Sequence, residues 1–215
     1  MLSDVSKIPG FLYDDEPEWL YSQAKEAPGL IVEVGSYMGK STVCLAQGAL
    51  DGHGGPVLSF DHHSRDRYTI QDQLDGHGGP VLSFDPQYIG NRPTYEQLLK
   101  NLKEYGVRDV VQTYVCRSEE VRRFVGDGEA GLIFIDGDHN YQSAVSDLDT
   151  LLPMLKAGGI VAVHDCTPWY PGVVRAVRER IFDQPDCFPE RELRKSGSYI
   201  AWGRKAVTSA PGRQR

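Results

Sequence analysis

The sequence of 215 residues has no long hydrophobic run and no surplus of basic residues. No stretch approaches the roughly 18–20 apolar residues that a membrane span needs. The first residues, MLSDVSKIPGFLYDDEPEW, lack the basic start and apolar run of a signal peptide. With 23 Lys and Arg against 30 Asp and Glu, the net charge of −7 argues against a non-specific grip on nucleic acid. We therefore expect a cytoplasmic protein with no membrane partner and no nucleic-acid partner.

Cysteine is also scarce. None of the 4 cysteines stands in a CxxC pair, which argues against a zinc knuckle, and without an export signal we expect reduced thiols. The 40% of hydrophobic residues and the 23 glycines are typical of a chain that buries a core. The length fits one domain. We expect that domain to span 1–205, with an N-terminal helical segment at 1–27 and a disordered tail at 206–215.

Short apolar runs alternate with helical patterns along the chain. This alternation predicts an α/β protein with a Rossmann-like, doubly wound and mostly parallel seven-stranded sheet that ends in an antiparallel strand. The expected strands are 30–35, 56–61, 110–116, 131–136 and 160–165, with a closing pair at 190–194 and 198–202. The expected helices are 40–50, 93–106, 118–125, 141–156 and 173–182. In such sheets, ligands bind at the carboxyl ends of the strands.

One segment is repeated. The run LDGHGGPVLSFD occurs at residues 50–61 and again at 74–85. Only one copy can be the second strand of the sheet. We assign the first copy, because Asp61 follows Gly39 by about 20 residues, the spacing expected for an acid that binds a ribose. The second copy then belongs to an insertion at 62–92.

The clearest motif is the run EVGSYMGKST at residues 33–42, which follows an apolar strand and opens a helix. It is one residue too short for a GxxxxGKS/T phosphate loop, and Tyr37 stands where the dinucleotide fingerprint GxGxxG needs its second glycine. Gly35 and Gly39 let the backbone approach a ligand closely. An acidic strand residue, a glycine turn and a helix start suit a ligand with a positively charged amino-acid end. The alternative is a plain turn between a strand and a helix.

Acidic residues follow three of the predicted strands, at Asp61, at Asp136 with Asp138, and at Asp165. A single acid at such a position is usually a cap or turn residue, but three at one sheet edge point to a site. Asp147, in the following helix, is expected to be a solvated or capping acid.

Two histidines stand beside these acids. His139 is a candidate general base, because histidine titrates near neutral pH. Alternatively, Asp136 and Asp165 hold a divalent cation, Mg²⁺ or Mn²⁺, that lowers the pKa of a hydroxyl group. His164 is a further candidate ligand, although its nitrogen suits softer metals than magnesium.

Two stretches resemble a known family. EVGSYMGKST resembles motif I of class I S-adenosylmethionine-dependent methyltransferases. Residues 135–166, which begin IDGDHNYQ and end VHDC, are similar to a small-molecule O-methyltransferase group with the pattern DGxHxY…GG…HD. The resemblance covers roughly 30–202. It implies methylation of a small hydroxylated metabolite, a natural product or a sugar, with S-adenosylmethionine as cofactor and a homodimer as the expected assembly.

The resemblance also implies roles for individual residues. Those that contact the methionine part of the cofactor are Gly35, Ser36, Tyr37 and Gly39, with Glu33 near its amino group and Ser41 and Thr42 at the helix start. Asp61 accepts hydrogen bonds from the ribose, Ser118 meets the adenine, and Asp136 lies beside the reactive methyl group. From the chemistry of the residues themselves, we expect His139 and Asp136 to be the catalytic residues.

Two other functions remain open. The first is an NAD(P)-dependent oxidoreductase on a similar sheet, against which the bulk of Tyr37 counts. The second is a non-catalytic homologue that retains the cofactor pocket, because an insertion next to the pocket can disable catalysis.

Overall fold

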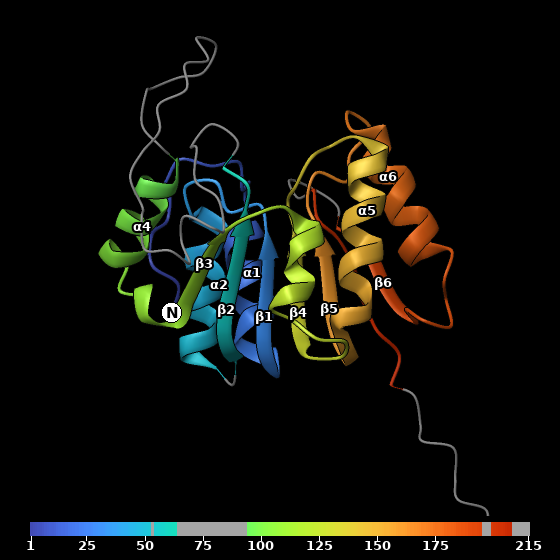
Figure 1. Cartoon of the computed structure of the whole chain (residues 1–215), viewed down its shortest axis with the longest axis horizontal. Coiled ribbons are helices and arrows are strands. Elements are labelled where there is room, and N and C mark those ends of the chain that lie inside the picture. The colour runs from blue at the N-terminus through green and yellow to red at the C-terminus, as the bar shows by residue number, and fades with distance from the viewer. Residues whose placement is uncertain (53, 64–93, 195–198, 208–215) are drawn as a thin grey trace, which may run out of the picture.

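The computed structural model describes residues 1–52, 54–63, 94–194 and 199–207. Within these residues, seven strands form one sheet in the order β3-β2-β1-β4-β5-β7-β6 (Figure 1). Strands β1 to β5 pair in parallel, and β7 lies antiparallel to both β5 and β6. The strands are β1 (Gly29–Val34), β2 (Gly54–Asp61), β3 (Val111–Val115), β4 (Ala130–Ile135), β5 (Leu155–Val163), β6 (Glu190–Leu193) and β7 (Ala201–Arg204). The predicted Rossmann-like sheet is confirmed.

Helices cover both faces of the sheet. The α-helices are α1 (Glu16–Glu26), α2 (Lys40–Asp51), α4 (Thr94–Glu104), α5 (Tyr141–Leu151) and α6 (Pro171–Val177). Short helical turns are η1 (Arg108–Val110), η2 (Ser118–Arg123), η3 (Leu152–Met154) and the π-helical η4 (Arg178–Phe182). In Figure 1, α4 lies at the β3 edge of the sheet, whereas α5 and α6 lie toward β6.

The core has two layers, one on each face of the sheet. Successive side chains of a strand point to opposite faces. In β4, Leu132 packs with residues of α1, α2 and α4, whereas its neighbour Ile133 packs with α5 and α6. Both are fully buried. Apolar side chains on both faces explain why the inner strands have continuous apolar sequences.

Two helix predictions were wrong in their limits. The helix expected at 141–156 ends at Leu151, and β5 begins at Leu155, before the two glycines that were expected to stop the helix. Pro153 lies between them and has no N–H to continue an α-helix. The helix expected at 173–182 starts earlier, at Pro171, and changes to a π-helix at Arg178.

The first copy of the repeat forms β2, as predicted. Its residues pair with both neighbours, for example Phe60 with Val34 of β1 and Asp61 with Val115 of β3. The second copy, at 74–85, lies outside the described residues, as do most of the expected insertion and positions 208–215 of the expected tail. None of the helices in the described ranges is long and apolar enough to cross a membrane.

The strand register aligns the carboxyl ends of three strands. Val34 of β1 pairs with Ile135 of β4, and Ile135 pairs with Val163 of β5. The next residues, Gly35, Asp136 and His164, therefore meet at one edge of the sheet. Backbone hydrogen bonds continue there, from Asp136 N–H to the Val34 carbonyl at 2.8 Å and from His164 N–H to the Ile135 carbonyl at 2.9 Å. This edge carries the candidate site.

Candidate functional site

The loop after β1 depends on its two glycines. Gly35 and Gly39 have φ values of +89° and +90°, which other residues adopt only with strain. A Cβ on Gly35 would lie 1.9 Å from the Asp136 carbonyl oxygen, and one on Gly39 would lie 2.6 Å from Leu98 Cδ1. From the sequence, we expected the missing side chains of these glycines to leave space for a ligand. In the structure, the chain's own atoms occupy that space, so the glycines first serve the packing of the loop on β4 and α4.

Glu33 lies beneath this loop and is fully buried. Its carboxylate accepts hydrogen bonds from the hydroxyl groups of Ser41 at 2.6 Å, Thr42 at 2.7 Å and Ser59 at 2.7 Å. Burial raises the pKa of Glu33 to about 7, although the three hydroxyl groups oppose that rise. Glu33, Ser41 and Thr42 were predicted to contact the cofactor. In the structure, the Ser41 and Thr42 hydroxyl groups donate to Glu33 below the loop.

Asp61 holds the loop from the end of β2. One carboxylate oxygen accepts the backbone N–H groups of Ser36 and Tyr37 at 2.9 and 2.8 Å, and the other accepts that of His63 at 2.8 Å. The hydroxyl group of Ser36 is buried and has no hydrogen-bond partner in the described part of the chain. Buried polar groups normally have a partner, so this hydroxyl group is available to a ligand.

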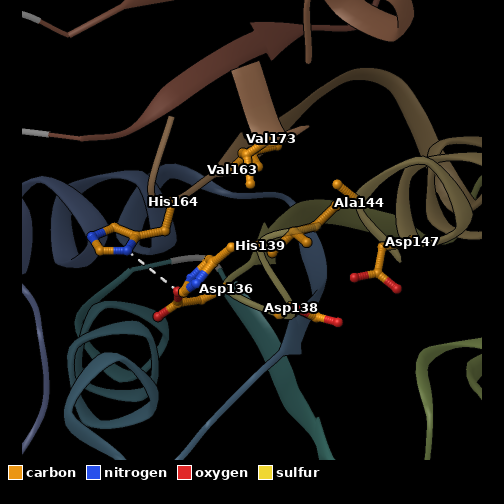
Figure 2. A pocket seen from close by; sticks show the side chains of 10 residues that line it. Asp136, Asp138, His139, Ala144, Asp147, Val163, His164 and Val173 are labelled. Carbon is orange, nitrogen blue, oxygen red and sulfur yellow. Dashed lines mark ion pairs between the residues drawn. The ribbon is translucent and has the colours of Figure 1, made fainter. Parts of the chain in front are cut away.

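A hydrogen bond joins Ser118 of η2 to Asp147 of α5 at the side of the site. The Ser118 hydroxyl group donates to the carboxylate of Asp147, a residue of α5 that is almost completely buried. Burial raises the pKa of Asp147. The expectation of a solvated or capping acid was therefore wrong, because Asp147 lies inside α5 and is buried. Figure 2 shows the pocket that this side chain lines, together with Ile135, Asp136, Gly137, Asp138, His139, Ala144, Val163, His164 and Val173.

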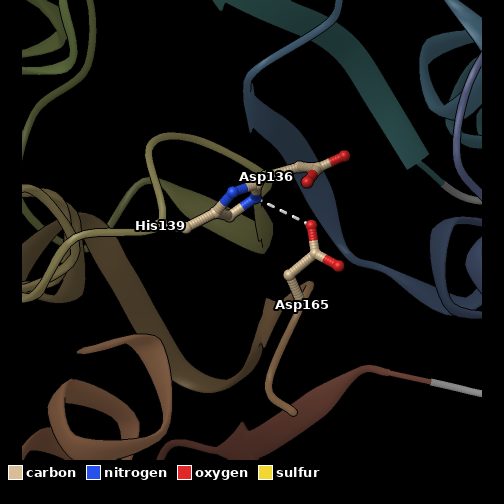
Figure 3. A group of neighbouring side chains, drawn as sticks. All are labelled: Asp136, His139 and Asp165. Carbon is tan, nitrogen blue, oxygen red and sulfur yellow. Dashed lines mark ion pairs between the residues drawn. The ribbon is translucent and has the colours of Figure 1, made fainter. Parts of the chain in front are cut away.

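His139 and Asp165 form a close pair above the ends of β4 and β5 (Figure 3). Nε2 of His139 lies 2.8 Å from Oδ2 of Asp165, and the His139 ring stacks on Tyr170 with 4.0 Å between centroids. Asp165 has a φ of +54°. This conformation is uncommon for residues other than glycine, and where it occurs it is often at a functional site. Asp136, His139 and Asp165 each offer a ligand atom, and these atoms lie within 4.8 Å of one another. The three residues could therefore hold a cation.

His164 lies buried behind these residues. Its Nε2 is 3.0 Å from Glu16, and its Nδ1 is 3.4 Å from Asp165. The same Nδ1 is 3.3 Å from Asp136, the pair that is marked in Figure 2. Burial alone would lower the pKa of His164, but the surrounding carboxylates raise it well above its usual value. A protonated imidazole has no lone pair for a metal. The structure therefore favours His139 over the predicted His164 as the nitrogen ligand of the candidate metal set.

Glu16 is the residue that sequence reasoning missed. It lies in the first turn of α1, yet its side chain is fully buried. Its carboxylate accepts the backbone N–H groups of Tyr13 at 2.8 Å and Tyr199 at 2.6 Å, and it pairs with His164. Burial would raise the pKa of Glu16, but the hydrogen bond from His164 lowers it below its usual value. No local sequence pattern marks this residue, because its partners are distant in the chain.

Comparisons with known proteins agree with this fold. The family model described as a methyltransferase domain matches residues 32–166. An S-adenosylmethionine-dependent O-methyltransferase from Thermotoga maritima has a TM-score of 0.62 at 13% identity, with 96% of this chain and 70% of that chain covered. An O-methyltransferase from Bacillus cereus, in complex with S-adenosylhomocysteine, has a TM-score of 0.59 at 15% identity, with 93% and 86% covered. TomG, an O-methyltransferase from Streptomyces achromogenes involved in tomaymycin synthesis and solved with S-adenosylmethionine, has a TM-score of 0.55 at 16% identity, with 89% and 80% covered. At these identities the three structures show a shared fold.

The packing of Gly35 leads to a first prediction. Gly35→Ala should lower the free energy of unfolding much more than Gly106→Ala. Both glycines have positive φ, +89° and +69°, so both variants carry the cost of about 1–2 kcal/mol of a left-handed residue. Only at Gly35 does the new Cβ meet another atom, because nothing lies within 4 Å of a Cβ on Gly106. Urea denaturation measures both, and equal losses would contradict the packing role.

Glu33 leads to a second prediction, about pH. Its pKa rises from 4.5 to about 7 on folding, so the stability that it contributes is present below pH 4.5 and is lost as the pH rises through 7. The difference in free energy of unfolding between the wild type and Glu33→Gln should therefore change by about 3 kcal/mol over this range. Urea denaturation at several pH values tests this, with Glu18→Gln in the exposed part of α1 as the control. A difference that is independent of pH would contradict the buried, proton-binding state.

Proposed function

The chain belongs to the methyltransferase-domain family, and from this we propose that it is an S-adenosylmethionine-dependent O-methyltransferase acting on a small hydroxylated metabolite, a natural product or a sugar. The observation that carries the proposal is the His139–Asp165 pair, which lies beside Asp136 at the carboxyl edge next to the glycine loop. Methyl transfer to a hydroxyl group needs a proton acceptor near the methyl donor, and this edge supplies one. The nicotinamide alternative gains no support from the comparisons.

The residues around the loop fit the cofactor. The unpartnered hydroxyl group of Ser36 can bind a polar ligand atom, and the Asp61 carboxylate suits the two hydroxyl groups of a ribose. Ser118 donates to Asp147, which lines the pocket at this edge, and it is the residue that we expect to meet the adenine. Glu33, with Ser41 and Thr42, supports the loop from below. S-adenosylmethionine, when bound, supplies a methyl group on a positively charged sulfur, and the sulfur keeps the electron pair when the carbon–sulfur bond breaks.

His139 is the proposed general base. Because its Nε2 lies against Asp165, the N–H there donates to that carboxylate, and Nδ1 keeps the lone pair that takes the proton of the acceptor hydroxyl group. Asp165 then stabilises the imidazolium that forms. Tyr170 stacks on the ring and limits its rotation. Asp136, at the end of β4, faces the same space.

A divalent cation also fits the site. Asp136, His139 and Asp165 would hold Mg²⁺ or Mn²⁺, which would lower the pKa of the acceptor hydroxyl group. A histidine whose one nitrogen binds a metal and whose other carries a proton cannot act as a base. The two routes therefore exclude each other at His139, and chelation distinguishes them.

The cofactor assignment leads to a third prediction. Calorimetric titration with S-adenosylhomocysteine should show binding to the wild type and at least a roughly tenfold loss for Asp61→Ala, since a ribose would lose a charge-assisted hydrogen bond. Asp85 occupies the same place in the second copy of the repeat, so Asp85→Ala is the matched control. No binding by the wild type would overturn the proposed function. Equal losses in the two variants would remove Asp61 from the cofactor site.

The base assignment leads to a fourth prediction. With labelled S-adenosylmethionine and a panel of hydroxylated acceptors, His139→Ala should lower turnover by about 10²–10⁴-fold, the usual contribution of a general base, while affinity for S-adenosylhomocysteine is kept. The wild type should keep its activity in EDTA. If EDTA abolishes turnover and Mg²⁺ or Mn²⁺ restores it, the metal route replaces the base route. Full activity of His139→Ala in EDTA would contradict both.

A further inference from the structure

Four aromatic side chains, Tyr13, Trp169, Tyr170 and Tyr199, lie beside the reacting edge, and we call them the aromatic wall. They come from the segment before α1, the β5–α6 connection and the segment before β7. Tyr199 is in edge contact with Tyr13 at 5.1 Å and with Trp169 at 5.9 Å between centroids. Tyr170 stacks on His139. The wall therefore borders the proposed base directly.

Much of this apolar surface faces solvent. The exposed fraction is 74% for Trp169 and 42% for Tyr13. Scattered exposed aromatics are common, but adjoining ones beside a reactive pair mark a binding surface. Burial and the charge of Asp165 both raise the pKa of Tyr13, which agrees with its position beside the reacting carboxylate.

The wall is held in place by backbone hydrogen bonds. Glu16 accepts the N–H groups of both Tyr13 and Tyr199, and Cys166 N–H donates to the Tyr199 carbonyl at 2.9 Å. In the β5–α6 connection, Trp169 N–H donates to the Thr167 hydroxyl group at 3.2 Å, and Tyr170 N–H donates to the Thr167 carbonyl at 3.0 Å. Rings on a fixed backbone lose little conformational freedom when a ligand binds, which favours affinity.

Two features indicate the chemical class of the ligand. Aromatic rings pack favourably on other aromatic rings, edge to face or offset. A phenolic hydroxyl group has a pKa of about 10, so an imidazole base removes its proton more readily than that of an aliphatic alcohol. In addition, Asp136, Asp138 and Asp147 line the pocket beside the wall, and no Lys or Arg of the described ranges lines it, which disfavours a phosphate-bearing acceptor.

We propose that the aromatic wall is the acceptor subsite and that it takes a planar phenolic compound, a proposal that rests on the proposed methyltransferase function. The ring of the acceptor packs against Trp169 and Tyr13, and its hydroxyl group lies toward His139. The O–H bond of the acceptor breaks and its proton goes to His139. The oxygen forms a bond to the methyl carbon, and the electron pair of the carbon–sulfur bond goes to sulfur. The products are an aryl methyl ether and S-adenosylhomocysteine.

The test uses two matched probes on the full chain saturated with S-adenosylhomocysteine. Catechol and trans-1,2-cyclohexanediol carry the same pair of neighbouring hydroxyl groups on a six-membered ring, and only catechol is aromatic. Calorimetry should show at least about tenfold tighter binding of catechol. Trp169→Ala and Tyr13→Leu should each weaken catechol binding by about threefold to tenfold, in line with an aromatic pair, without changing the affinity for S-adenosylhomocysteine. Leu50→Ala, an exposed apolar residue at the far end of α2, is the control.

The outcomes separate the two proposals. Equal affinity for the two probes, or unchanged catechol binding in both wall variants, overturns the aromatic subsite while leaving the methyltransferase function intact. A wild type that does not bind S-adenosylhomocysteine overturns the proposed function itself. Methyl transfer from labelled S-adenosylmethionine to catechol, and not to the cyclohexanediol, supports both.

Discussion

The buried carboxylate of Glu16 is the interaction on which the acceptor side of this site depends. A carboxylate without partners would be costly to bury, so its three donors must stay in place. Those donors belong to the segment before α1, the end of β5 and the segment before β7. One side chain thus fixes parts of the chain that the parallel sheet alone would leave unconnected. It also sets which nitrogen of His164 faces Asp136 and Asp165.

Charges of opposite sign alternate across the edge from this point. Glu16 faces His164, His164 faces Asp136 and Asp165, and Asp165 faces His139. Each buried charge is compensated by the next, and His139 lies at the solvent side of the series. Such an alternating series lets a small pocket hold several acids without strong repulsion.

The sheet could be predicted from sequence because apolar runs and their spacing set the strands, and the register then brings Asp136, His139 and Asp165 together at one edge. The prediction failed where a long-range contact decides the role of a residue. Glu33 follows the motif pattern, and the hydrogen bond that it accepts from Ser59 of a neighbouring strand has no sign in the local sequence. Asp147 has the sequence context of a surface acid, but Ser118 and burial make it part of the pocket wall. Glu16 has no local signal at all.

The identity between β2 and residues 74–85 bears on how the chain folds. Either copy carries the same side chains, so packing between β1 and β3 cannot tell the two apart. The lengths of the connections to α2 and α4 do distinguish the two copies. With the first copy in the sheet, the connection from α2 is very short and the connection to α4 is long. With the second copy in the sheet, both connections would have intermediate lengths. Since closure entropy grows with the logarithm of length, the observed arrangement loses less chain entropy. The competing arrangement would keep the same strand contacts, and its conversion to the observed one would require the second copy to unpair from both β1 and β3.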